Sequence, residues 1–501
     1  MSDIRSDEKK FSFTKVERKK AGKVLYIIGM ILLFIAVLLL FSLNWMFVKF
    51  GHVSIDSTLY TLTAPKTGTD TAYIWTFLYM SLLPTVIIEL VVWIITNNFY
   101  KKNVVMKIRT DKDKLSIRLF PFMPLRRILF GLSIIALVCS GVYVSYASGL
   151  TAYIKSKTTS TALYDDYYVN PATANITFTE NKSNVIYLYA ESLEKTLESK
   201  EEGGAKSTNI LPKLTELQKK YIAVANEKGE QGHVVKGGDW TMAGMVSQSS
   251  ATPLMININF YNYNENAKFL PGAFSLGQIL ASNGYKNIFV TGCDSKFAAT
   301  DLYYNQHGNY EIVDPDAAKK KGYIPEDYDV FWGYEDLKMF EILKKEITAN
   351  YESGQPFNIT AATLDTHADD VYECSNCDNQ YTDVHDKVYH CADDQIAEFI
   401  EWFEKQPCYE DTTLIISGDH CSFATTYFDD CTNYNRTVFS MFVNAQVEKK
   451  DYVKTFTTLD MLPSTLAAMG VQIEGDRLGL GTNLFSDKRT LAEEYGIQKL
   501  N

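Results

Sequence analysis

Three long apolar stretches interrupt the polar pattern in the first third of the chain. Val24–Val48 and Ile128–Leu150 contain no charged side chain, and Ala72–Ile95 contains one, Glu89. Each can cross a bilayer core of about 30 Å as a helix that rises about 1.5 Å per residue. The first stretch is too long, and lacks a small-residue cleavage site, to be a removed signal peptide. The pattern therefore predicts a three-helix transmembrane anchor over residues 24–150.

Basic residues are distributed unevenly around these stretches. Lysines and arginines are frequent in residues 1–23, nine lie in the loop 101–127, and the loop between the first two stretches contains only Lys49 and Lys66. Cytoplasmic loops carry the excess of Lys and Arg, so residues 1–23 and the loop 101–127 are predicted to be cytoplasmic. Three crossings of the cell membrane then place everything after Leu150 on the extracytoplasmic side. Nucleic-acid binding would also explain a basic loop, but the flanking apolar stretches favour topology.

Beyond residue 183 the pattern changes to compact apolar runs that alternate with amphipathic segments. The runs at 184–190, 285–291, 357–364, 412–417 and 439–445 predict strands, and the segments 272–283, 341–351, 393–404 and 458–469 predict helices. This alternation is typical of a mostly parallel sheet with helices on both faces. The predicted fold class is α/β over residues 184–487, with a juxtamembrane helix and linker at 151–183 and a tail at 488–501.

Metal-ligand side chains follow several of the predicted strands. Glu191 follows the first strand, Asp365–His367 the third, and Asp419 and His420 the fourth. Taken singly, an acid after a strand is more often a helix cap, but ligands of such sheets bind beyond the carboxyl ends of the strands. We therefore expect Glu191, Asp419 and His420 to bind one divalent cation. Carboxylate and imidazole ligands favour Zn²⁺ or Mn²⁺.

The stretch GGDWTMAGMVSQ, residues 237–248, places a threonine at the start of a predicted helix. Thr241 is either an ordinary N-cap or a nucleophile, since a helix N-terminus favours negative charge and binds phosphate. A divalent cation lowers the pKa of coordinated water from about 15.7 to about 7, and a coordinated alcohol should respond in the same direction. We expect Thr241 to be the fourth metal ligand and the nucleophile. His367 would bind the phosphate or protonate the leaving group, and Trp240 and Asp365 are candidate substrate contacts.

Seven of the eight cysteines follow the third apolar stretch. One polar insertion contains three of them, Cys374, Cys377 and Cys391. A short loop is bracketed by Cys421 and Cys431, and the isolated cysteines are Cys293 and Cys408. In an oxidising compartment the first two groups predict disulfide bonds that close loops. A zinc knuckle is the alternative for the first group, because its CSNC motif is followed by His385 and His390. Seven is odd, so one of the isolated cysteines is predicted to remain free or to pair elsewhere.

Four stretches, NVIYLYAES, GGDWTMAGMVSQ, TLDTH and SGDH, resemble in this order the membrane-bound phosphoglycerol transferases of the alkaline phosphatase and sulfatase superfamily. That group includes enzymes like phosphoglycerol transferase I and, as more distant relatives, the lipoteichoic acid synthases and phosphoethanolamine transferases. The resemblance covers residues 184–487. It implies a sulfatase-like fold, a divalent metal bound by the four ligands named above, a covalent intermediate on Thr241, and phosphate contact from His367.

The chain departs from this group at two places. Lipoteichoic acid synthases use a Trp and an Arg around the headgroup, after a segment that matches residues 284–301. Ala298 and Thr300 stand at those positions here, and Lys296 is the candidate replacement for the positive charge. The proline often found just after the DTH-type histidine is also absent, since Asp369 and Asp370 follow instead.

The resemblance implies transfer of a phosphoglycerol headgroup from an anionic phospholipid, phosphatidylglycerol, to a hydroxyl of a glycan or teichoic-type glycerophosphate polymer of the cell envelope. Phosphoethanolamine transfer, phosphodiester hydrolysis and a non-enzymatic envelope protein are the alternatives. A sulfatase in the strict sense matures a Cys or Ser within C/S-x-P-x-R, and the chain contains no such motif: Pro253 in SATPLM has no following arginine.

Overall fold

The computed structural model describes residues 10–15, 23–50, 72–99, 102–109, 114–118, 125–158, 162–255, 268–368, 371–378, 380–431 and 433–500. The chain forms two compact units. The first comprises Met1–Lys49 and Asp70–Lys155, and the second comprises Phe50–Thr69 and Ser156–Asn501. The candidate chemistry belongs to the second unit.

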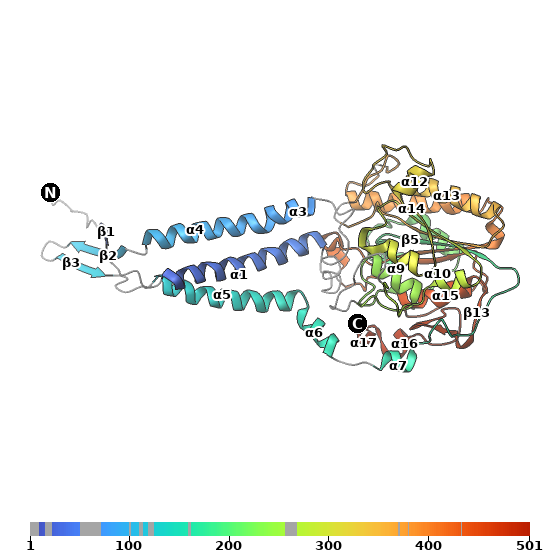
Figure 1. Ribbon diagram of the computed structural model, residues 1–501, viewed down its shortest axis with the longest axis horizontal. Helices are drawn as coiled ribbons and strands as arrows, with labels where there is room; N and C mark the ends of the chain where they lie inside the picture. Colours follow the sequence, from blue (N-terminus) through green and yellow to red (C-terminus); the bar gives the residue numbers. More distant parts are fainter. Residues whose placement is uncertain are drawn as a thin grey trace. The chain divides into compact units, whose positions relative to one another are not determined.

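Long apolar helices make up most of the first unit (Figure 1). They are α1, Lys23–Phe50; a segment composed of α3, Ala72–Phe77, a π-helical turn η1, Leu78–Leu82, and α4, Leu83–Phe99; and α5, Leu125–Ala147. Three stretches within them, Lys23–Lys49, Ile74–Asn97 and Arg126–Ala147, are long and apolar enough to cross a membrane. The structure thus confirms the apolar helices that the hydrophobic pattern predicts.

Polar and small residues join these helices to one another. Tyr26 Oη lies 2.8 Å from Thr96 Oγ1, and Ser81 Oγ donates to the carbonyl oxygen of Phe41 at 3.1 Å. Gly29 of α1 packs closely on α5, since an added Cβ would lie 3.1 Å from a backbone atom of that helix. Small residues and interhelical hydrogen bonds of this kind, each contributing about 1 kcal/mol, hold helices together in lipid.

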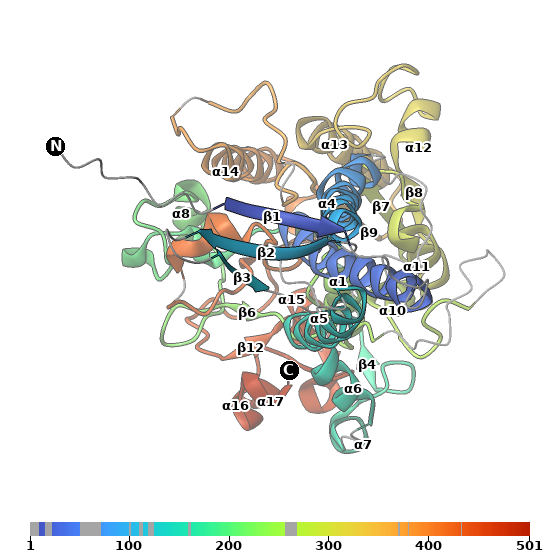
Figure 2. The ribbon, with the colours of Figure 1, turned by 90° about the vertical axis from the view of Figure 1, so that its left-hand side faces the viewer.

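A small antiparallel sheet completes the first unit (Figure 2). β1, Lys10–Lys15, pairs with β2, Lys102–Arg109, and β2 pairs with β3, Lys114–Arg118. The hydrophobic pattern did not predict these strands. Because paired strands lie side by side, residues 10–15 lie beside residues 102–109 and 114–118, on the same side of the helices. The predicted topology requires the same arrangement.

The second unit is built on a six-stranded sheet with the strand order β11–β10–β5–β9–β7–β8. The strands are β5, Asn184–Ala190; β7, Lys286–Thr291; β8, Glu311–Val313; β9, Phe357–Ala362; β10, Thr412–Gly418; and β11, Ser440–Val443. All neighbouring strands are parallel except β11, which pairs antiparallel with β10. Every residue of β5, β9 and β10 is buried, which explains their continuous apolar runs.

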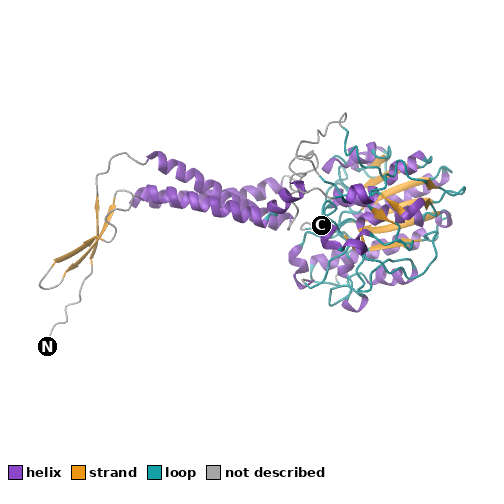
Figure 3. Cartoon of the chain, turned by 90° about the horizontal axis from the view of Figure 1, so that it is seen from below, coloured by secondary structure: helices purple, strands orange, loops and turns teal. Residues whose placement is uncertain are grey.

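Helices cover both faces of this sheet (Figure 3). One layer contains α9, Thr241–Ser250; α10, Leu276–Ser282; α11, Thr300–Gln306; and α15, Met461–Ala468. The other contains α8, Pro212–Lys220; α12, Pro315–Lys320; α13, Asp336–Glu352; and α14, Val384–Phe403. Alternate residues of β5 supply the two apolar cores, Tyr187 and Tyr189 on the first face and Ile186 and Leu188 on the second. The predicted α/β class with a mostly parallel sheet is confirmed.

Shorter elements connect the layers: α6, Leu150–Thr158; α7, Leu163–Tyr167; β4, Ile176–Thr177; β6, Gly232–His233; β12, Phe456–Thr457; β13, Gln472–Ile473; β14, Arg477–Leu478; β15, Gly481–Thr482; α16, Leu491–Tyr495; and α17, Ile497–Leu500. Caps explain two shifted boundaries. α10 begins four residues later than the range 272–283 because Ser275 and Gln278 form a capping box. α14 begins well before residue 393 because the Asp383 side chain accepts from the first backbone amides.

Candidate active site

Four side chains converge at the carboxyl ends of β5 and β10. Glu191 directly follows β5, Asp419 and His420 follow β10, and Thr241 is the first residue of α9. Because β5 and β10 are parallel neighbours, the residues that follow them meet at one edge of the sheet. His420 Nε2 lies 3.3 Å from Glu191 Oε1 and 3.4 Å from Asp419 Oδ2. Ligand atoms of these last three residues all lie within 4.8 Å of one another.

The Thr241 hydroxyl belongs to this group and does not cap its helix. It donates to Glu191 Oε2 at 3.2 Å and lies 3.2 Å from His420 Nε2. Trp240 occupies the N-cap position, where no side-chain capping bond is present. Thr241 is half-buried, whereas Glu191, Asp419 and His420 are at most 2% exposed. The arrangement favours a nucleophilic role for Thr241 over a capping role.

A network of hydrogen bonds orients the three buried side chains. Asp419 Oδ1 accepts the backbone N–H groups of Ser192 at 2.9 Å and His420 at 2.8 Å, and Ser192 Oγ donates to Glu191 Oε1 at 2.7 Å. Ser192 adopts a φ of 52°, a left-handed conformation that is strained for a residue other than glycine. His420 Nδ1 lies 2.8 Å from Cys421 O. With the proton on Nδ1, the Nε2 lone pair faces the other ligands.

The buried group has two carboxyl groups, Glu191 and Asp419, and one imidazole, His420, so negative charge exceeds positive charge when both carboxyl groups are ionised. Burial would raise the pKa of Glu191, but the charge and hydrogen bond of His420 lower it to about 2. Burial raises the pKa of Asp419 to about 7, and the charge of Glu191 acts in the same direction. Burial opposes protonation of His420, yet Asp419 and Glu191 raise its pKa to about 10. A divalent cation at this position would offset the excess negative charge.

One carboxylate oxygen of the group has the environment expected of a cation ligand. Asp419 Oδ2 is buried and accepts no hydrogen bond from the described residues. A buried oxygen without a partner costs about 1–3 kcal/mol, a cost that a bound cation would remove. Carboxylate, imidazole and hydroxyl groups are donors that Zn²⁺ and Mn²⁺ accept. The residues at this site therefore fit a single divalent ion.

The position of α9 is set by close contact with the backbone after β10. An added Cβ at Gly244 would lie 2.3 Å from the carbonyl oxygen of Asp419. Gln248 Nε2 donates to the carbonyl oxygens of Gly418 at 2.9 Å and Asp419 at 3.1 Å. Tyr187 Oη of β5 donates to Gln248 Oε1 at 2.7 Å. α9, which begins with Thr241, is therefore held directly on the segment that contains Asp419 and His420.

An ion pair between the buried Glu194 and the half-buried Arg436 supports the loop after His420. Both Nε and Nη2 of Arg436 donate to the Glu194 carboxylate, with an Nε–Oε2 distance of 3.0 Å. Glu194 Oε1 also accepts the Ser422 N–H at 2.8 Å, and Arg436 Nη2 donates to Ser422 O at 2.7 Å. The two charged residues are 242 positions apart, so no local pattern could have paired them.

His367 follows β9 and lies among aromatic rings. Its ring centroid is 4.6 Å from that of Trp332, and its charge contributes to lowering the pKa of Glu191. Phe297 packs edge-on against Trp332 at 5.6 Å, and Phe331 stacks on Tyr372 at 5.2 Å. These rings come from three separate loops, and for that reason the sequence pattern did not group them with His367.

The other three predicted substrate contacts, Asp365, Trp240 and Lys296, have their described contacts outside the group around Thr241. Asp365 Oδ1 accepts the backbone N–H of Asp336 at the start of α13, so Asp365 has a structural contact there. Trp240 is 8% exposed and packs in the apolar core. Lys296 is exposed, and its charge acts on the pKa of Asp301. No described contact joins Lys296 to Thr241 or its three partners.

The segment 284–301, singled out in the sequence as a departure from the resembled group, nevertheless lies beside α9. Thr300 Oγ1 is 3.8 Å from Met242 Sδ, one residue after Thr241. Ala298 and Ala299 have φ values of 53° and 57°, both in the left-handed region. Strained backbone of this kind is concentrated at functional sites. Asp369 and Asp370, the other departure, lie outside the described residues.

Known proteins share both the sequence pattern and the fold. Over 339 residues the chain is 28% identical to phosphoglycerol transferase I of Salmonella choleraesuis strain SC-B67, and this alignment covers 66% of the chain and 42% of that protein. Phosphoglycerol transferase I of Salmonella typhi matches with the same identity and coverage. The chain thus spans less than half the length of the curated relatives it matches.

Two solved structures align with this chain. Lipooligosaccharide phosphoethanolamine transferase A of Neisseria meningitidis, an integral membrane protein, aligns over 90% of this chain and 86% of its own, with 10% identity and a TM-score of 0.50. A lipoteichoic acid synthase from Listeria monocytogenes aligns over 62% of this chain and 79% of its own, with 17% identity and a TM-score of 0.47.

A family model identifies the family of this chain. The sulfatase model matches residues 183–471, which contain Glu191, Thr241, His367, Asp419 and His420. With the parallel sheet and the residues at its edge, this match places the chain in the alkaline phosphatase and sulfatase superfamily. The chain belongs to the sulfatase family and is a distant homologue of phosphoglycerol transferase I.

Proposed function

We propose that this chain is a membrane-anchored transferase that moves a phosphoglycerol headgroup from phosphatidylglycerol to a hydroxyl of a glycan or glycerophosphate polymer. The observation that carries the proposal is the position of the Thr241 hydroxyl, 3.2 Å from both Glu191 Oε2 and His420 Nε2. A hydroxyl among metal-type ligands at a helix N-terminus suits attack on a phosphodiester. The homology to phosphoglycerol transferase I supports this reaction class.

The four convergent residues, Glu191, Thr241, Asp419 and His420, would hold one Mn²⁺ or Zn²⁺ ion. When bound, such an ion lowers the pKa of the hydroxyl and offsets charge on the phosphoryl oxygens. Thr241 is the only one of the four that is half-buried rather than buried. It is therefore the residue that reaches the substrate.

The protein side chains then carry out a double displacement. A bond forms between Thr241 Oγ1 and phosphorus, while the hydroxyl proton leaves along the hydrogen bond to Glu191 Oε2. His367 protonates the diacylglycerol oxygen as its bond to phosphorus breaks. In the second step the acceptor hydroxyl gives its proton to His367 and attacks phosphorus. The bond between Thr241 Oγ1 and phosphorus breaks as the proton returns from Glu191 Oε2 to Thr241 Oγ1. Trp332 covers one side of the His367 ring and keeps it in place.

The apolar helices suit a lipid donor. Three stretches of the first unit can cross a membrane, and tethering an enzyme to the bilayer raises the effective concentration of its lipid substrate. Basic residues in the N-terminal segment and the loop 101–127 support a cytoplasmic location for both. We accordingly place the catalytic domain on the extracytoplasmic side of the cell membrane.

Headgroup-labelled lipids test this proposal. Purified full-length protein should release diacylglycerol from phosphatidylglycerol, and mass spectrometry should find glycerophosphate on Thr241. Thr241→Ala should abolish both signals while the melting temperature is unchanged. Phosphoethanolamine on Thr241 would identify the donor as phosphatidylethanolamine instead. Free glycerophosphate at an undiminished rate without an acceptor would identify a hydrolase, and full turnover by Thr241→Ala would overturn the nucleophile assignment.

A further inference from the structure

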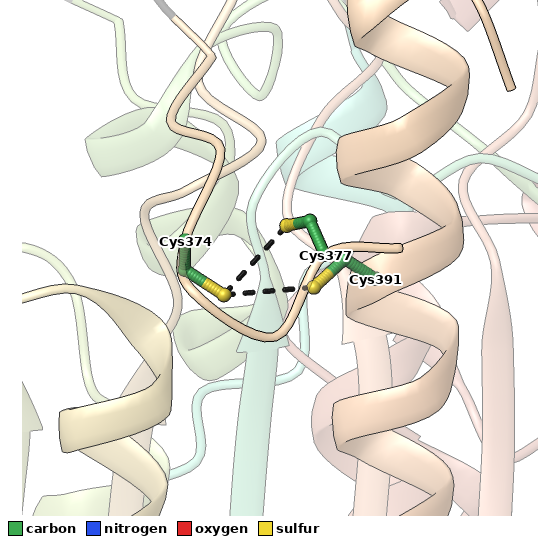
Figure 4. A group of neighbouring side chains, drawn as sticks. All are labelled: Cys374, Cys377 and Cys391. Atoms are coloured by element: carbon green, nitrogen blue, oxygen red, sulfur yellow. Dashed lines mark hydrogen bonds between the residues drawn. The ribbon is translucent and has the colours of Figure 1, made fainter. Parts of the chain in front are cut away.

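Three cysteines outside the candidate active site converge on one point (Figure 4). Cys374 and Cys377 lie on the segment between β9 and α14, and Cys391 lies within α14. The Cys374 sulfur is 3.6 Å from the Cys377 sulfur and 3.6 Å from the Cys391 sulfur. All three sulfurs lie within 4.8 Å of one another. Cys374 and Cys391 are buried, and Cys377 is half-buried.

The sulfur separations match those of a metal–thiolate site. In a tetrahedral zinc site with Zn–S bonds of about 2.3 Å, neighbouring sulfurs are about 3.8 Å apart. A disulfide needs its sulfurs about 2.05 Å apart, so none of these pairs is bonded, and all eight cysteines of the chain are free thiols in the structure. A disulfide also joins only two sulfurs, so it would not explain why the sulfur of the third cysteine lies beside them.

The surroundings of the sulfurs are those of thiolates. Gln395 Nε2 donates to the sulfur of Cys391 at 3.4 Å and to that of Cys374 at 3.7 Å. These two N–H···S contacts compensate charged thiolate ligands, as outer hydrogen bonds do in metal sites. The sulfurs of a disulfide are neutral and have little need of such donors.

We propose that Cys374, Cys377 and Cys391 bind one Zn²⁺ ion that joins the loop after His367 to α14. The two-residue spacing between Cys374 and Cys377 is the usual spacing of zinc ligands on a tight turn, and the Cys377 N–H bonds to Cys374 O at 3.2 Å in such a turn. The three thiolates would occupy three of the four tetrahedral positions of the ion. Thiolates select Zn²⁺ over Mn²⁺, which prefers oxygen ligands. This assignment does not depend on the proposed transferase reaction.

The site would act on the catalytic loop from a distance. Tyr372 lies between His367 and Cys374 in sequence, its backbone N–H donates to Asp365 O at 2.8 Å, and its ring stacks on Phe331. An ion that ties Cys374 and Cys377 to α14 therefore restrains the segment beside His367. Its role is positioning, since none of the three sulfurs belongs to the group around Thr241.

Cobalt substitution of the full-length protein in detergent tests the assignment. Co²⁺ bound to thiolates absorbs in the near ultraviolet through sulfur-to-metal charge transfer, which oxygen and nitrogen ligands do not produce. We expect one equivalent of this absorption per chain in the wild type. It should persist in Glu191→Gln, which alters the other metal site, and in Cys408→Ser, which changes a buried cysteine outside the cluster. Cys377→Ser, at the half-buried position, should reduce it at least tenfold.

A second measurement on the unmodified protein avoids any loss of folding. A maleimide reagent should leave Cys374, Cys377 and Cys391 unlabelled until a strong chelator is added, after which all three are labelled. Peptides linked by a disulfide among these cysteines, released by a reductant and indifferent to the chelator, would overturn the proposal. Full labelling before chelation, or no charge-transfer band in the wild type, would do the same.

Discussion

The contact between α9 and the backbone after β10 makes Gly244→Ala a sensitive probe of the active site. The new Cβ would lie 2.3 Å from the carbonyl oxygen of Asp419 and 2.9 Å from its carbonyl carbon. Ordinary carbon–oxygen contacts begin at about 3.3 Å, so α9 and the Asp419 backbone must separate by about 1 Å. Both neighbours are backbone, and no side-chain rotation can relieve the overlap.

The separation acts directly on the catalytic group. Thr241 lies one helical turn before Gly244, and Asp419 and His420 lie on the segment that must move. A displacement of about 1 Å at a catalytic constellation costs on the order of 100-fold in rate. Overpacking of a buried contact costs about 1–3 kcal/mol of stability. Helix propensity alone would make the Gly244→Ala protein more stable by about 1 kcal/mol. The steric overlap predicts the opposite, a less stable protein.

Headgroup release from labelled phosphatidylglycerol and a thermal melt of the same preparation measure the two quantities. We expect Gly244→Ala to lose about 100-fold in kcat/KM and to melt at a lower temperature than the wild type. Gly272→Ala is the matched control, since an added Cβ there meets nothing within 4 Å. A Gly244→Ala protein that melts higher than the wild type and keeps its activity would refute the close packing of α9 on the ligand segment.

Substitutions at four residues separate the roles of individual side chains. Thr241→Ser should keep the covalent phospho-intermediate seen by mass spectrometry, whereas the hydroxyl-free Thr241→Val should lose at least about 10³-fold in turnover; equal loss in both would argue against a hydroxyl nucleophile. Glu194→Gln leaves the half-buried Arg436 without its carboxylate and should lower stability by about 2 kcal/mol in a denaturant titration, and a wild-type midpoint would contradict this. Trp332→Ala removes the ring that packs on His367, the proposed proton donor, and should lower kcat/KM about tenfold, or about 1.4 kcal/mol, with little change in melting temperature; unchanged kinetics would exclude a role at the site. Burial, with the charge of a neighbouring aspartate, raises the pKa of Asp365 from 3.8 to about 10, so its contribution to stability is complete below about pH 4 and is lost as pH rises toward 10, at up to about 1.4 kcal/mol per pH unit. Asp365→Asn should therefore flatten the fall of melting temperature between pH 6 and pH 9, and a slope equal to that of the wild type would show that this carboxyl is not the titrating group.

The strands of the sheet were predictable because they are buried on both faces. β5 matches the predicted run 184–190 at both ends, and β10 extends the run 412–417 by one residue. β11 was expected as another strand, but its antiparallel direction depends on how the chain returns to the sheet. The sheet of β1, β2 and β3 was not predicted, because strands that pair over about 90 residues leave no local periodic signal.

The candidate site divides in the same way. Glu191, Asp419 and His420 follow apolar strands directly, so their common edge could be inferred from strand order. Thr241 could be placed at a helix start, but only the folded chain shows that its hydroxyl contacts ligands and leaves the cap position to Trp240. Cys374 and its two partners had two explanations in the sequence, and the sulfur positions favour metal binding. The predicted disulfide between Cys421 and Cys431 is not formed in the structure, where both cysteines are free thiols.

The sequence by itself determined which segments are apolar, which strands are buried and which ligand-type residues end them. These features are local, because the hydrophobic effect acts on each side chain and strand direction follows from chain order. Only the tertiary structure decided the contacts between distant segments: Gly244 on Asp419, Arg436 on Glu194, and the aromatic rings around His367. Such contacts depend on shape and distance in three dimensions, to which residues far apart in the chain contribute without any shared pattern.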